Sequence, residues 1–123
     1  MRRTVASLAV LLSALPALAA CGGSDSSDSP DPADAGPKVI EVTIEGDSVT
    51  PNGERVEVAV GQDVELEVTA DVPGEIHVHS SPEQALEYDA GTQTVTIEGI
   101  DKPGTVDVES HDPAKVIVQL EVR

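Results

Sequence analysis

Regular alternation of aliphatic and charged residues is the feature that most constrains this chain. From residue 38 onward, valine, isoleucine and threonine make up about a third of the sequence, and aliphatic residues recur at every second position. A period of two matches a β-strand with one buried face, because successive side chains of a strand point to opposite sides. β-branched residues also favour strands over helices. The pattern predicts an all-β fold.

The alternating segments are short, and Gly, Pro, Asn and Asp residues separate them. They cover residues 40–44, 56–60, 64–70, 76–79, 95–97, 106–108 and 116–122. Seven or eight such strands predict an antiparallel Greek-key β-sandwich, in which two sheets pack face to face. The expected core consists of aliphatic side chains of one parity, namely Val58, Leu66, Val68, Ile97, Val106, Val108, Val118 and Leu120.

Composition restricts both the core and the partners. The chain has no Phe, no Trp and one Tyr, so the core must be aliphatic, and we expect Tyr88 to close one end of the sandwich. The 23 acidic residues outnumber the 7 basic ones and give a net charge of −16. This charge repels polyanions, so the sequence predicts no nucleic-acid partner.

The first 21 residues carry the pattern of an exported protein. Arg2 and Arg3 precede an apolar run that ends near residue 20, which is typical of a secretory signal peptide. The residues Leu-Ala-Ala-Cys at 18–21 resemble the lipobox of bacterial lipoproteins. The resemblance implies cleavage after residue 20, acylation of Cys21 and a lipid anchor on the extracytoplasmic face of the cell membrane. The alternative is an ordinary signal peptide that leaves Cys21 as a spare thiol.

A short acidic segment follows this cysteine. Residues 22–37 contain Ser, Asp, Pro, Gly and Ala, with no large apolar side chain, which is typical of a disordered tether. The expected organisation is a signal peptide at 1–20, a lipidated cysteine with its linker at 21–37, and a folded domain at 38–123. Because Cys21 is the only cysteine, a disulfide or a cysteine zinc site is excluded.

Three segments of the chain follow one another in an order that resembles the cupredoxin-like domain. They are residues 72–79, 90–97 and 102–122. In that family a His opens one strand, an Ala-Gly turn precedes a Thr-rich strand, and a Pro-Gly-Thr turn starts the strand that leads to the remaining copper ligands. The resemblance implies a cupredoxin-like sandwich, with His77 at the first His ligand and Ser110 at the copper-binding Cys. A blue copper site needs that thiolate, so the resemblance implies the fold without the blue copper centre.

The three histidines are the candidate metal ligands. His77 and His79 stand two positions apart on a strand, which places their Cβ atoms about 7 Å apart on one face. His111 is the candidate third ligand, and nitrogen and oxygen ligands favour copper or zinc. Carboxylates near them in the sequence are Glu75, Glu83, Glu109 and Asp112. The alternative is that the histidines are exposed residues without a metal, because the sequence does not show which parity of residues 76–79 faces the core.

Nothing in the sequence indicates an enzyme. Ser110, His111 and Asp112 are adjacent, so on an extended chain they point to opposite faces and do not form a catalytic relay. No phosphate-binding loop or dinucleotide motif is present. The sequence therefore predicts a lipid-anchored binding module with an unidentified envelope partner. The alternative is a structural or adhesive envelope domain that binds neither a metal nor a small ligand.

Overall fold

The computed structural model describes residues 35–123. The regular secondary structure of these residues consists of β-strands, with no helix among them. The strands are β1 (Lys38–Glu45), β2 (Ser48–Thr50), β3 (Glu54–Val58), β4 (Val64–Ala70), β5 (Gly74–Val78), β6 (Gln84–Tyr88), β7 (Gly91–Ile97), β8 (Gly104–Ser110) and β9 (Lys115–Val122). The all-β prediction is confirmed. This part of the chain has nine strands, where seven or eight were expected. The sequence did not indicate the short β2 or β6, because neither carries a run of alternating β-branched residues.

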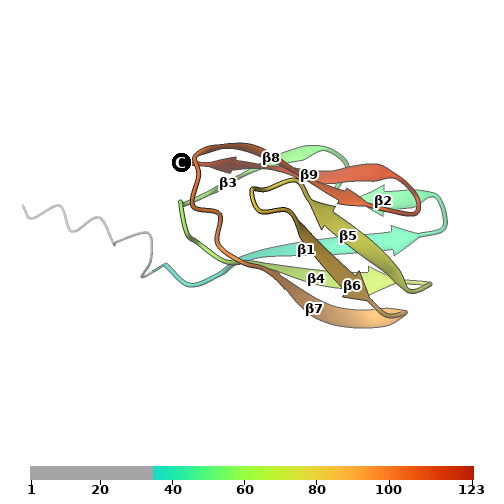
Figure 1. The fold of residues 1–123 in the computed structure, drawn as a ribbon. Coiled ribbons are helices and arrows are strands. Elements are labelled where there is room, and N and C mark those ends of the chain that lie inside the picture. Colours follow the sequence, from blue (N-terminus) through green and yellow to red (C-terminus); the bar gives the residue numbers. More distant parts are fainter. Residues whose placement is uncertain (1–34) are drawn as a thin grey trace, which may run out of the picture.

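The strands form two sheets that stack face to face (Figure 1). One sheet has the order β2-β1-β4-β7 and the other has the order β3-β9-β8-β5-β6. Both are mixed, where purely antiparallel sheets were expected, because β1 runs parallel to β4 and β3 runs parallel to β9. A half-buried strand shows the same period of two in either direction, so the alternation alone does not distinguish the two arrangements.

The core lies between the sheets and is almost entirely aliphatic. All eight core residues expected from the sequence are buried, and Leu66, Val68, Ile97, Val108, Val118 and Leu120 have no exposed surface. Tyr88 is 3% exposed. The predicted core is therefore confirmed.

A register shift between β8 and β9 interrupts the alternation near the C-terminus. Val108 pairs with Val118, whereas Glu109 pairs with Val116, so Ile117 is the extra residue of a β-bulge. Both Ile117 and Val118 are fully buried as a result, and Val116 is only half-buried.

The predicted signal peptide, Cys21 and most of the predicted linker lie outside the described residues. Within residues 35–123, no helix is long and apolar enough to cross a membrane.

Candidate metal centre

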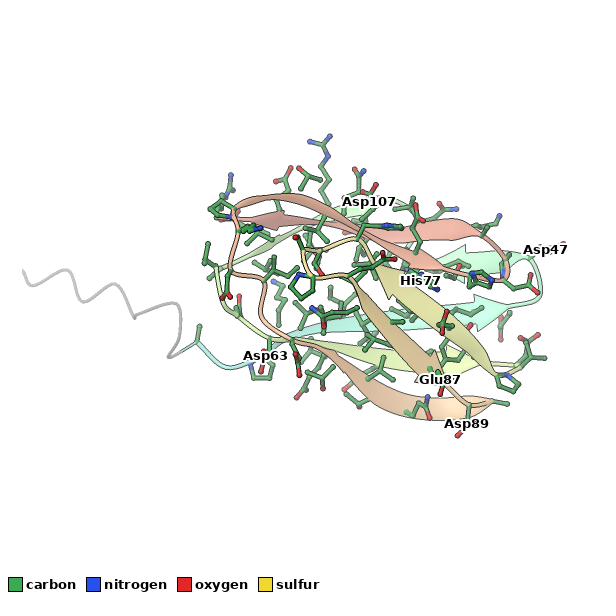
Figure 2. All side chains as sticks on the ribbon, in the orientation of Figure 1. Asp47, Asp63, His77, Glu87, Asp89 and Asp107 are labelled. Atoms are coloured by element: carbon green, nitrogen blue, oxygen red, sulfur yellow. The ribbon has the colours of Figure 1, made fainter. Side chains whose placement is uncertain are left out.

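The burial of β5 settles which way its histidine faces. Ile76 and Val78 have no exposed surface and point into the core. His77 lies between them in sequence, and its side chain therefore projects from the outer face of the sheet, with His79 continuing the same parity just past the strand. Figure 2 shows His77 on β5.

The pairing of β5 with β8 carries the third histidine to the same face. Ile76 is paired with Ser110, and the backbone N–H of His111 donates to the carbonyl of Glu75 over 2.9 Å. His111 therefore lies opposite Glu75, which is two residues away from His77 on β5. Residues of the same parity on antiparallel neighbours share a face, so Glu75, His77 and His111 project together.

These three side chains converge. The rings of His77 and His111 are stacked, with centroids 5.3 Å apart and planes inclined by 22°. One ligand atom from each of Glu75, His77 and His111 lies within 4.8 Å of the other two. The ligands of a tetrahedral zinc ion, at about 2.0–2.1 Å from the metal, are about 3.4 Å apart, which is comparable with the separation of these three atoms.

His79 takes no part in this group. Its Nε2 atom lies 2.9 Å from Oε2 of Glu109, the residue paired with His77. Both contacts are diagonals across β5 and β8: His77 reaches His111, and His79 reaches Glu109. The structure thus brings together two of the three predicted histidines. Glu75, which stood in the sequence as one carboxylate among several, is the third member, and only the strand register reveals it.

Carboxylates hold both nitrogens of the His77 ring. Nε2 contacts Oε1 of Glu75, and Nδ1 lies 3.4 Å from Oε1 of Glu83. The hydrogen bond to Glu75, followed by the one to Glu83, raises the pKa of His77 above its usual value. If a metal ion replaced the proton on one ring nitrogen, the carboxylate at the other nitrogen would orient the ring, as carboxylates commonly do for metal-bound histidines.

The residues present do not fit a blue copper centre. Ser110, at the position where the resemblance places the thiolate, points into the sandwich and is 2% exposed. Its hydroxyl donates to the carbonyl of Pro113 and lies 3.3 Å from that of Lys115, so it holds the β8–β9 turn. His77 projects from the opposite face of the same sheet. A hydroxyl that points away from the imidazole cannot complete the Cys and His set that such a centre requires.

Neither a protein-family model nor a curated protein matches the sequence. Similar solved structures include a purple cupredoxin from Nitrosopumilus maritimus, at 15% identity over 68% of this chain and 98% of that chain, with a TM-score of 0.45. Reduced auracyanin from Roseiflexus castenholzii is 13% identical over 72% of this chain and 98% of that chain, with a TM-score of 0.49. A Cu(I) form of an amicyanin variant is 16% identical over 75% of this chain and 89% of that chain, with a TM-score of 0.47. At these identities the likeness concerns the fold and does not extend to a site.

Proposed function

We propose that this protein is a lipid-anchored, extracytoplasmic binding module with a cupredoxin-like domain that holds a divalent metal ion, Zn(II) or Cu(II), at Glu75, His77 and His111. The convergence of these three ligand atoms within 4.8 Å carries the proposal. Two imidazoles and one carboxylate form a donor set that suits both ions. The role is binding rather than catalysis.

The surroundings of the site also favour a cation. Glu83 and Glu109 lie next to the histidine rings, and the whole chain carries a net charge of −16. A negative surface raises the local concentration of cations and speeds their arrival. The site is partly exposed, since Glu75 and His77 are half-buried and His111 is exposed, so we expect binding to be weak and reversible.

The anchor is supported by the sequence. Residues 18–21 resemble a lipobox, Cys21 is the only cysteine, and the acidic segment that follows it would hold the sandwich away from the membrane. More than one acyl chain is needed for stable attachment, which is what the lipobox resemblance implies.

Calorimetric titration of the purified protein with ZnCl₂ and with CuSO₄ tests the metal site. Wild type should bind one ion, and the double variant His77→Ala, His111→Ala should lose that binding. His79→Ala is the matched control, because it removes an exposed imidazole of the same face that lies outside the group. Equal affinities in all three proteins would show that scattered carboxylates hold the ion, and would favour a structural or adhesive domain.

A further inference from the structure

Among the described residues, the two sheets have four edge strands, and only β7 lacks the usual protection of such an edge. Edge strands present unpaired backbone N–H and C=O groups, which proteins commonly protect by charge, proline or short length. β2 has three residues and is followed by Pro51, and β3 carries Glu54, Arg55 and Glu57. β6 has five residues and carries Glu87. β7 has seven residues, with neither a charged side chain nor a proline among them.

β7 is also regular along its whole length. It pairs with β4 without a register shift, from Gly91 opposite Ala70 to Ile97 opposite Val64. β7 is the outermost strand of the four-stranded sheet, and no described strand is bonded to its other side (Figure 1). A regular, uncharged edge rich in β-branched residues is the form of strand to which an extended peptide adds most readily.

The inward side of this edge is apolar and incompletely covered. Val95 on β7 and Leu86 on β6 pack against the core but are only half-buried. β6 is the edge strand of the other sheet, and the side chain of Gln84 bonds to both the N–H and the carbonyl of Glu98, which holds the two edges next to each other. A strand added to β7 would place an inward side chain beside Val95, where an apolar group removes surface from water.

The outward side is acidic, with short side chains next to the edge. Thr94 and Thr96 are exposed and are paired with Glu67 and Glu65 of β4. Glu67 is paired in turn with Glu41 of β1, and like charges directly opposite one another destabilise a sheet. The outward-facing residues of β1, β4 and β7 include four glutamates and no lysine or arginine. A long cationic side chain on an added strand would lie over the short threonines and reach these carboxylates.

Charge and backbone chemistry select the strand that fits. A second copy of this chain would bring its own net charge of −16 to an edge already flanked by glutamates. Residues 22–34 of the chain carry four Asp and two Pro, so the same face repels them, and the prolines lack the N–H groups that a paired strand needs. A partner segment with basic side chains fits both the charge and the edge.

We propose that β7 is a docking edge for an extended segment of a partner protein in which apolar side chains alternate with lysine or arginine. The segment adds a fifth strand to the four-stranded sheet. Its apolar side chains lie beside Val95, and its basic side chains lie over Thr94 and Thr96 toward Glu67 and Glu65. The metal group lies on the outer face of the other sheet, so this interaction is independent of metal binding.

A synthetic peptide tests the docking edge. The probe is a short fluorescent peptide with blocked termini in which lysine and valine alternate, and the control is an isomer with its lysines in one block. Fluorescence anisotropy at constant ionic strength measures both affinities for the purified protein. The alternating peptide should bind saturably and at least about tenfold more tightly, because only alternation sends every lysine to one face of a strand. Equal affinities, or no binding, would overturn the proposal.

Hydrogen exchange followed by NMR locates the bound peptide. The amides of β7 that point away from β4 should gain protection, whereas those of β2, β3 and β6 should not. Protection of another edge would place the peptide elsewhere and refute the assignment. Protection of the β7 edge before any peptide is added would also refute it, because a second copy or another segment of this chain would then cover the edge.

Two lysine substitutions of equal charge separate the edge from the general field of an acidic protein. Thr94→Lys places a cation opposite Glu67 on β7 and should weaken binding by at least about tenfold, because it repels the incoming lysines. Ser48→Lys places a cation opposite Glu45 on β2, the other edge of the same sheet, and should change affinity by less than about twofold. Equal weakening by both would show diffuse attraction only.

A second pair of variants tests the acceptors. Glu65→Gln, Glu67→Gln should weaken peptide binding by about three- to tenfold, as expected for the loss of two exposed ion pairs. Glu41→Gln, Glu45→Gln removes the same charge from the same face, but on β1, which lies beyond β4 from the edge. Its effect should be smaller, and the reverse order would contradict the proposal. His77→Ala should lose zinc binding and keep peptide binding, so failure of one proposal is distinguished from failure of the other.

Discussion

The imidazole rings of His77 and His111 lie stacked at 5.3 Å although 34 positions of sequence separate them. The contact crosses β5 and β8 on a diagonal, because the residue paired with His77 is Glu109 and the N–H of His111 is bonded to Glu75. Side chains of aromatic size reach along such diagonals. The three histidines of the chain are therefore not equivalent.

The first prediction follows from this inequality. His77→Ala and His111→Ala should each weaken zinc binding by at least about tenfold, as expected when a metal site loses a ligand or its orienting partner. His79→Ala should leave the affinity close to that of wild type. Isothermal titration at neutral pH measures all three, and repeating it at lower pH should show weaker binding in wild type, because protonated imidazoles do not coordinate. A larger loss in His79→Ala than in His111→Ala would contradict the assignment.

A second prediction concerns the aliphatic core. Leu66 has no exposed surface and lies in the middle of β4, so Leu66→Ala should reduce the free energy of unfolding by about 2–5 kcal/mol. Val39 in the neighbouring strand β1 is 49% exposed, and Val39→Ala should change it by less than about 0.5 kcal/mol. Urea denaturation followed by circular dichroism compares the two variants. Similar effects would mean that the burial of β4 is misassigned.

Tyr88 gives a prediction about alkaline pH. Burial, with help from Asp112 and Asp71, raises its pKa above the ordinary value of 10.0. The neutral phenol therefore contributes stability that is fully present below about pH 10 and is lost as the pH rises through the raised pKa. A spectrophotometric titration of the native protein should show tyrosinate forming at higher pH than in the urea-unfolded protein. Coincident curves would place the ring in solvent.

The anchor is tested by labelling. Cells that express the protein and grow on a fatty-acid analogue should incorporate the label, and Cys21→Ser should abolish it and release the protein from the membrane fraction. An unlabelled wild type recovered in the soluble extracytoplasmic fraction would refute acylation.

Much of the fold could be predicted because, in a β-sandwich, every second side chain of a strand faces the core and is therefore apolar. Val58, Leu66 and Val108 follow the period of two, and all three are buried. The pattern failed at Ile117, where the bulge adds a residue that no change of composition marks. The pattern also failed to distinguish parallel from antiparallel strand pairs, because inward-facing side chains recur at every second position in both.

The candidate site was harder to predict for a related reason. The sequence does not show which face of β5 is buried. Ile76 and Val78 alternate with the histidines, so either set of side chains fits a period of two. The meeting of His77 with His111, and the place of Glu75 between them, depend on a register between strands far apart in the chain.

The position of β9 has a consequence for how the molecule is made. This strand lies between β3 and β8 and pairs Glu54 with Val118. Because β9 follows both neighbours in the chain, β3 and β8 each have an unpaired edge during synthesis until β9 has been made, and only then can the five-stranded sheet close. Strand edges exposed in this way pair readily with other chains. The acidic side chains of β3, Glu54 and Glu57, would protect the nascent chain from its neighbours during that interval.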